Sequence, residues 1–231
     1  MSGSLELVKQ LREITGAGML DCKKYLEQAN NNLDEAVKLF RSESGKKAEK
    51  KGSRIAAEGL VNFYENAECL LILELNSETD FVAKDNNFIA LAESVANELL
   101  NKDESEAQHC IAEMINTSIS KLGENIKLRR YFKIDKNNNV YAYSHNNKIV
   151  SMVELKSSDE MLAKDICMQI VASNPLAIDE SSLDKEILKS EKDIYKQELE
   201  KLDKKEDIKR NILEGKMKKF VNENTLLNQP F

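Results

Sequence analysis

The feature that most constrains the fold of this chain is an internal repeat. Shifting the sequence by 80 residues aligns Glu74-Leu75-Asn76-Ser77 with Glu154-Leu155-Lys156-Ser157, and Ala83-Lys84-Asp85 with Ala163-Lys164-Asp165. Seven of the nineteen positions from 74 to 92 are identical to their counterparts. Self-similarity of this kind indicates two copies of one supersecondary unit. We therefore expect two related α+β units with antiparallel sheets.

Each copy has the pattern of a β-hairpin followed by a helix. The elements expected in the first copy are strands at 59–64 and 69–75 and helices at 88–100 and 106–121. Those expected in the second copy are strands at 140–144 and 148–155 and a helix at 159–173.

One further strand is expected at 126–134, at the end of the first copy. Its apolar residues alternate with polar ones and predict a single buried face, formed by Ile126, Leu128, Phe132 and Ile134. Arg130 breaks the inward pattern, and we expect an edge position or an ion pair to accommodate it. The second copy has no equivalent strand before the sequence ends, so we expect that unit to be either naturally incomplete or truncated at the C-terminus.

The residues outside the repeat predict three helical or linking segments. Residues 1–41 carry three short apolar periodicities and are expected to form a three-helix bundle resembling a ubiquitin-associated (UBA) domain. Residues 42–54 read as a basic linker that is partly helical. Apolar residues spaced along 184–222 indicate a helical hairpin or coiled coil whose charges form a solvated face. The first α+β unit then spans 55–135 and the second 136–231.

The composition excludes several classes of protein. With 40 acidic and 34 basic residues the net charge is −6, which argues against a general nucleic-acid binder. No apolar run reaches the roughly 20 residues that a membrane span needs. Four widely separated cysteines are typical of reduced thiols in an intracellular protein, and two histidines are too few for a His-rich metal site.

The candidate site is the turn Thr79-Asp80-Phe81-Val82, because the second copy has Asp159-Glu160-Met161 there instead of Thr-Asp-Phe. An aromatic beside an acid at a turn indicates a contact with a partner; the alternative is that Phe81 packs on the sheet, as Met161 would. On the first view, Phe81→Ala leaves stability intact, whereas Met161→Ala lowers it. Met19 and Leu20 pose a similar choice between a partner contact and the bundle core.

Several short motifs, in order along nearly the whole chain, resemble those of the elongation factor Ts family. They are Leu7-Val8-Lys9, Leu11-Arg12, Thr15-Gly16-Ala17-Gly18-Met19, Asp21-Cys22-Lys23-Lys24, Thr79-Asp80-Phe81-Val82-Ala83-Lys84, Gly123-Glu124-Asn125-Ile126 with Arg129-Arg130, and Gly215-Lys216-Met217.

The resemblance implies a guanine-nucleotide exchange factor, not an enzyme, that binds GDP-bound and nucleotide-free elongation factor Tu. It implies that Thr79, Asp80, Phe81 and Val82 displace the partner's Mg²⁺ and that Asp80 caps a short helix or contacts the partner. It further implies docking through Arg12, Met19, Leu20, Lys23 and His145. We also expect self-association through the helical hairpin. We expect no cofactor, no metal, and no direct contact with nucleic acid or membrane. The expected location is a bacterial cytoplasm or a bacterially derived organelle.

Two rival functions rest on parts of the sequence. Glu78, Asp80 and Asp85 cluster as in an enzyme site, with His145 at the matching turn of the other copy, but no nucleophile–base set or metal-ligand spacing accompanies them. The bundle alone suggests a ubiquitin-binding module, which leaves the α+β units without a function. Binding of ubiquitin by the isolated bundle discriminates the second rival from a GTPase-binding protein.

Overall fold

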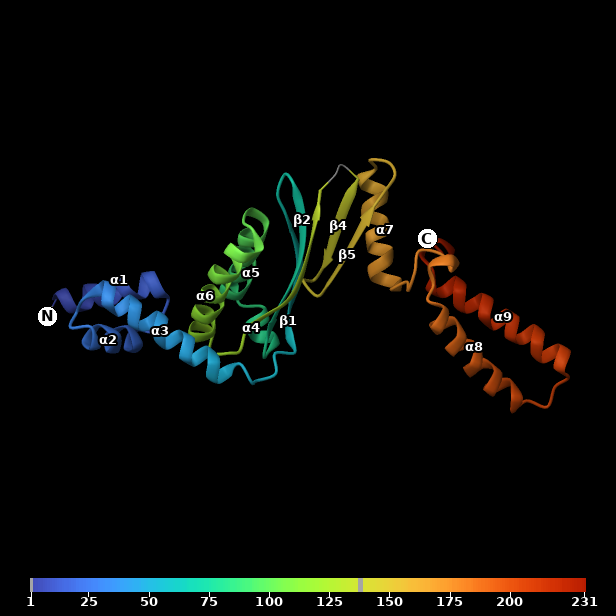
Figure 1. Ribbon diagram of the computed structural model, residues 1–231, viewed down its shortest axis with the longest axis horizontal. Helices are drawn as coiled ribbons and strands as arrows, with labels where there is room; N and C mark the ends of the chain where they lie inside the picture. Colours follow the sequence, from blue (N-terminus) through green and yellow to red (C-terminus); the bar gives the residue numbers. More distant parts are fainter. Residues whose placement is uncertain (1, 137–138) are drawn as a thin grey trace. The chain divides into compact units, whose positions relative to one another are not determined.

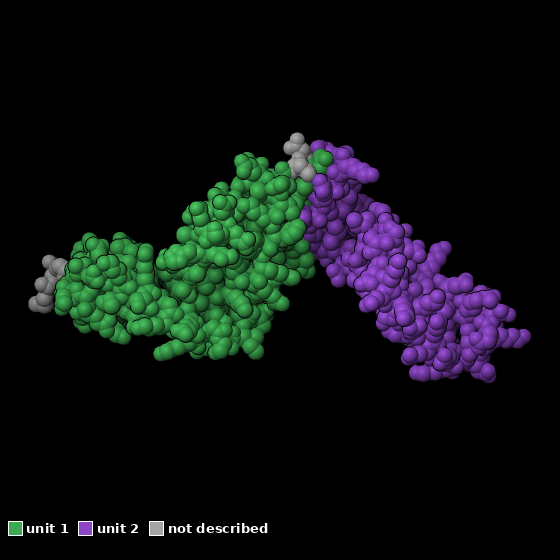
Figure 2. Space-filling model, in the orientation of Figure 1, with its two compact units in different colours: residues 1–150 green, residues 151–231 purple. Residues whose placement is uncertain are grey.

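The computed structural model describes residues 2–136 and 139–231. It divides into two compact units, residues 1–150 and 151–231, which Figure 2 shows in different colours. In the described residues, no helix combines the length and the apolar character needed to cross a membrane. The mixture of helices and two small sheets confirms the α+β class.

The N-terminal bundle consists of the helices α1 (Ser2–Thr15), α2 (Met19–Gln28) and α3 (Leu33–Lys51). The rings of Tyr25 and Phe40 meet edge to face at its centre, with their centroids 5.8 Å apart. The side chain of Asn32 caps α3 by accepting a hydrogen bond from the Glu35 N–H.

The helix α3 extends well beyond residue 41. It packs against α6 (Glu104–Leu122), with Ser44 and Ala48 buried, and Ala48 belongs to the hydrophobic core of the neighbouring sheet. The segment 42–54, expected as a partly helical linker, is helix as far as Lys51 and has one packed face. Its small side chains Ser44 and Ala48 allow this contact, and Lys51 at the end of the helix reaches the Gly123 carbonyl at the end of α6.

The first sheet has the order β1 (Glu58–Glu65), β2 (Cys69–Ser77), β3 (Lys127–Asp135), with both pairings antiparallel. Helices α5 (Asn86–Asn101) and α6 lie on one face of this sheet (Figure 1). Leu71, Leu73 and Leu75 occupy every second position of β2, so all three point into the core beneath these helices, where they are fully buried.

The expected buried face of β3 is wrong at Phe132 and Ile134: Phe132 is 55% exposed, and neither residue packs against the core beneath the helices. A β-bulge opposite Glu74 and Leu75 shifts the register, so that Tyr131 pairs with Leu73 and packs against the core instead. An extra residue in one strand moves every later side chain to the opposite face. The ion pair expected for Arg130 is present, because its Nε donates to Glu74 Oε2 at 2.7 Å.

The second hairpin joins β4 (Val140–His145) to β5 (Ile149–Glu154) through Asn146 and Asn147, both with positive φ. This is the backbone of a type I′ turn, which asparagine tolerates. The turn lies beside β1, because the Val61 N–H donates to the Asn147 carbonyl at 2.8 Å. Lys148 adds an ion pair to Glu58 at 2.9 Å.

The second unit contains α7 (Glu160–Ser173), which ends as expected at Asn174 in a left-handed conformation before Pro175. Two further helices, α8 (Lys185–Glu200) and α9 (Glu206–Asn224), form the expected helical hairpin. An ion pair between Lys216 and Glu198 joins the two helices of this hairpin.

Gly59 is the position at which we expect the fold to be most sensitive to one added methyl group. Its φ is +143°, and a Cβ there would lie 2.1 Å from the Leu75 carbonyl oxygen. We predict that Gly59→Ala lowers the free energy of unfolding by about 3 kcal/mol, through backbone strain and separation of β1 from β2. Gly45→Ala, in the helix α3 with open space around it, is the control and is expected to stabilise by about 0.5–1 kcal/mol. Urea unfolding midpoints that coincide for the two variants would contradict this account.

Candidate functional site

The candidate site begins where β2 ends and the short helix α4 (Asp80–Ala83) starts. Thr79 is the N-cap of α4, and its hydroxyl oxygen accepts a hydrogen bond from the Val82 N–H at 3.4 Å. The expectation that Asp80 caps this helix is therefore wrong. Asp80 is its first residue, and its carboxylate accepts a hydrogen bond from Lys84 Nζ at 2.7 Å.

Phe81 projects into solvent, with 83% of its surface exposed. Its neighbours hold α4 in place, since Val82 packs against the hydrophobic core and Ala83 is buried. The alternative that Phe81 packs on the sheet is thus excluded. A large exposed aromatic on an anchored helix is a candidate contact for a partner.

The second copy presents Met161 in nearly the same way, which corrects the expectation that this residue is packed. Asp159 caps α7 by accepting from the Leu162 N–H, and Met161 is 79% exposed. Met161→Ala is therefore expected to leave stability nearly unchanged. The difference in burial on which the expected contrast with Phe81 rested does not exist.

The copies differ instead in how the helix continues. In the first copy α4 ends at Ala83, and Asp85 caps a separate helix by accepting from the Asn87 N–H at 2.7 Å. In the second, α7 runs without a break through the equivalent position Asp165. Cys167, which aligns with Asn87, is fully buried. Thus only the first copy carries its exposed residue on a separate short helix.

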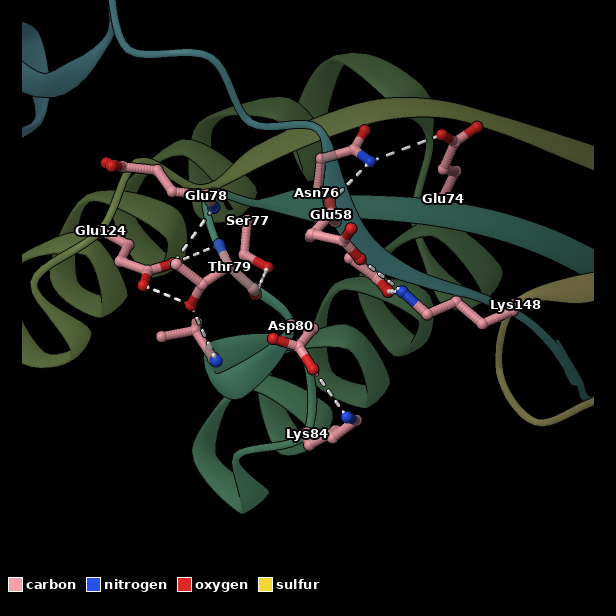
Figure 3. A network of polar contacts seen from close by, with 12 residues as sticks. Glu58, Glu74, Asn76, Ser77, Glu78, Thr79, Asp80, Lys84, Glu124 and Lys148 are labelled. Atoms are coloured by element: carbon pink, nitrogen blue, oxygen red, sulfur yellow. Dashed lines mark hydrogen bonds and ion pairs between the residues drawn. The ribbon is translucent and has the colours of Figure 1, made fainter.

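Glu124 fixes the start of this segment, a role that the sequence did not reveal. Its Oε2 accepts hydrogen bonds from the backbone N–H groups of Glu78 and Thr79 at 3.1 and 3.0 Å, and its Oε1 accepts from the Thr79 hydroxyl at 2.6 Å. Figure 3 shows the Glu124 side chain pointing at Thr79. The only signal in the sequence was that Glu124 lies in a family motif.

Glu78 in turn binds the segment that contains Glu124. Its Oε1 accepts from the Asn125 N–H at 2.6 Å and lies 3.5 Å from Arg54 Nη1. The Asn125 side chain in turn donates to the Arg54 carbonyl at 2.7 Å. The chain segments after α3, after β2 and before β3 therefore meet at one junction beneath α4.

The four bundle residues expected to contact a partner all lie on the surface. Met19 and Leu20 are 53% and 85% exposed, so they do not fill the bundle core. The preceding loop explains their position, because Ala17 is buried in the core and α2 starts two residues later, at Met19. Arg12 and Lys23 are also exposed.

His145 is exposed at the turn between β4 and β5. Tyr143 Oη lies 3.2 Å from its Nδ1, and Asn146 Nδ2 lies 3.2 Å from its Nε2. The turn is held beside β1, which begins next to α4, by the contacts of Asn147 and Lys148. The structure thus brings the turn of His145 to the strand beside α4, whereas the bundle residues lie on other elements.

The acidic residues around Thr79 do not form a cation site. In residues 2–136 and 139–231, no group of three or more His, Cys, Asp or Glu side chains could hold a metal ion. The hydrogen bond from Lys84 holds the pKa of Asp80 below its ordinary value, and the same bond raises the pKa of Lys84. The Asp80 carboxylate is therefore charged at neutral pH.

We predict that Lys84→Met raises the pKa of Asp80 toward its ordinary value. Because the folded-state pKa of Asp80 is lowered, the pair stabilises the fold above the unfolded pKa, and this contribution is lost as the pH falls through the folded value. A carboxyl ¹³C NMR titration measures the shift. Lys102→Met, which removes a comparable pair with Glu98, is the control and should leave Asp80 unchanged. Equal Asp80 pKa values in the wild type and Lys84→Met would show that the bond does not form.

Comparison with known proteins gives a consistent assignment. Residues 78–231 match the family model described as elongation factor TS, and residues 5–47 match the model of a UBA-like domain, as expected for the bundle. Among curated relatives, elongation factor Ts of Alkalilimnicola ehrlichii is 40% identical, and that of Xanthomonas oryzae pv. oryzae is 42% identical. Each alignment covers 100% of this chain and 83% of the relative.

The family match includes the candidate site, since it starts at Glu78 and extends through Glu124 and His145. The similarity to the curated relatives also covers the bundle with its exposed Met19 and Leu20. On these grounds the chain belongs to the elongation factor Ts family.

Proposed function

We propose that this chain accelerates GDP release from elongation factor Tu by inserting Phe81 beside the nucleotide and displacing the bound Mg²⁺. Family membership makes the chain a nucleotide exchange factor for elongation factor Tu. The insertion and the residues that perform it are our proposal. The observation that carries it is the 83% exposure of Phe81 on a helix that Val82 and Ala83 anchor to the core.

The chemistry of the partner makes displacement of Mg²⁺ an effective route to exchange. GTPases hold a diphosphate through backbone amides, a lysine and a bridging Mg²⁺. A protein that binds the nucleotide-free form more tightly must weaken nucleotide binding by the same factor, since coupling between two sites is reciprocal. Moving the metal weakens the hold on the phosphates without any covalent step, so the chain needs no catalytic residue or cofactor of its own.

Phe81 cannot supply the whole effect. Burying one Phe side chain contributes roughly 1.5–3 kcal/mol, about one to two powers of ten in affinity. We therefore assign the remaining binding energy to docking surfaces. Arg12, Met19, Leu20 and Lys23 contact the nucleotide-binding domain of the partner, and His145 contacts a more distant domain.

The other three residues of the turn have supporting roles in this proposal. Thr79 caps α4, and Val82 anchors it to the core, so that Phe81 is presented on a fixed helix. The Asp80 carboxylate is paired with Lys84 and orients the insertion or contacts the partner; it is not a Mg²⁺ ligand. In this division, residues 1–41 dock, 55–135 carry the insertion and 136–231 complete the contact.

We also propose that the α8–α9 hairpin mediates self-association. The chain acts in a bacterial cytoplasm, or in the matrix or stroma of a bacterially derived organelle, without direct contact to nucleic acid or membrane. Ile194 and Ile208 are 45% and 46% exposed on this hairpin. Sedimentation velocity over a concentration series tests the dimer. Replacing both isoleucines by Ser should shift the dimer to monomer, and an unchanged distribution would assign the dimer to another surface.

For the exchange reaction, we predict that Phe81→Ala lowers the maximal rate of GDP release by about 10–100-fold, because an interaction made only in the displaced state is removed. Release of a fluorescent GDP analogue from elongation factor Tu, at saturating exchange factor, measures the rate. The unfolding midpoint should not change, since the side chain is exposed.

Two control variants sharpen this test. Phe231→Ala removes an aromatic that is 80% exposed at the other end of the chain, and it should leave the maximal rate unchanged. The double variant Met19→Ala/Leu20→Ala should raise the half-saturation concentration while keeping the maximal rate, as expected for docking residues. Full exchange activity in Phe81→Ala would refute the insertion and leave the docking surfaces as the source of exchange.

A further inference from the structure

Glu124 is the residue that determines where the chain goes after β2. Gly123, the left-handed C-cap of α6, places Glu124 in the turn before β3, next in space to Glu78 and Thr79. The N–H groups of those two residues belong neither to the ladder of β2 nor to that of α4. The Glu124 carboxylate supplies the acceptor that both groups need after they leave the sheet.

The position of Glu124 is itself fixed from two sides. Lys51 Nζ, at the end of α3, donates to the Gly123 carbonyl at 2.6 Å, and the Asn125 N–H donates to Glu78 Oε1. The negative charges of Glu78 and Glu124 lie near the positive charges of Arg54 and Lys51. A carboxylate held in this way is a rigid support.

Thr79 connects this support to Phe81. Its hydroxyl donates to Glu124 Oε1, and the same oxygen accepts from the Val82 N–H in the first turn of α4. Phe81 lies between Thr79 and Val82 in the chain and is exposed, so its own packing cannot define its direction. Its direction depends on the contacts at its neighbours.

We propose that Glu124 is a positioning residue for nucleotide exchange: by holding Glu78 and Thr79 it sets the direction in which α4 presents Phe81 to the partner. The inference rests on the proposed insertion of Phe81. It adds that the insertion works because the segment is ordered before the partner binds. A segment that must be ordered during binding loses conformational entropy at that step, which reduces the coupling.

The test compares three variants of the full chain. Glu124→Ala removes all three acceptor contacts. Glu124→Gln keeps an oxygen for the two N–H groups and turns an amide toward the Thr79 hydroxyl, which can then accept instead of donate. Glu113→Ala removes a glutamate with a 57% exposed side chain from α6, outside the junction, and is the matched control.

We expect Glu124→Ala to lose hydrogen-exchange protection at the amides of Glu78 and Thr79 without the partner present. It should also lower the maximal rate of GDP release about tenfold while leaving the half-saturation concentration nearly unchanged. Glu124→Gln should keep most of the protection and the rate, and Glu113→Ala should match the wild type. If Glu124→Ala does not fold, Glu124→Asp, whose carboxylate is one methylene shorter, should show the same pattern more weakly.

Combination with Phe81→Ala separates positioning from a general loss of structure. If Glu124 acts only through Phe81, then Glu124→Ala should add nothing to the defect of Phe81→Ala. Additive defects, or unchanged protection at Glu78 and Thr79, would overturn the inference while the proposed function stands. If elongation factor Tu releases GDP at the normal rate with Phe81→Ala alone, the proposed insertion of Phe81 is refuted, and the inference about Glu124 is refuted with it.

Discussion

The central strand β2 is the constraint on which the rest of the first unit depends. It is hydrogen-bonded on both sides, and Leu71, Leu73 and Leu75 are fully buried beneath α5 and α6. A strand so enclosed cannot slip, because a shift of one residue would expose its whole apolar face. The point at which the chain leaves the sheet, after Ser77, is therefore fixed. Beyond it, Glu124 binds the backbone N–H groups of Glu78 and Thr79. The position of Phe81 follows from a buried strand and a partly buried turn.

In the proposed mechanism, stability and partner binding depend on different residues. The core leucines and Gly59 maintain the sheet, whereas Phe81, Met19 and Leu20 are exposed and contribute little to folding. Exchange of a bound nucleotide requires binding energy that is realised only in the partner's displaced state. Exposed apolar side chains on anchored helices suit that role, because they gain burial only when the partner binds.

The sequence predicted most of the elements but not every side-chain direction. Hairpins and helices follow from periodicity and turn residues that are local in the chain. For Arg130 the pattern left an edge position or an ion pair open, and it did not identify Glu74 as the partner. The misplacement of Phe132 came from a bulge, which an alternating pattern does not reveal. The difference in residue type between Phe81 and Met161 does not predict burial, because both are the second residue of their helix and are 83% and 79% exposed. The contact of Glu124 with Thr79 joins residues far apart in sequence, so spacing alone could not predict it.

The most direct test of the account is the Mg²⁺ dependence of GDP release with wild-type chain and with Phe81→Ala. In millimolar Mg²⁺, elongation factor Tu should release GDP at least about tenfold faster with saturating wild-type chain than with saturating Phe81→Ala. With the metal removed by a chelator, Phe81 has nothing left to displace, and the two rates should converge. A ratio of rates that stays the same with and without Mg²⁺ would contradict displacement of the metal as the mechanism.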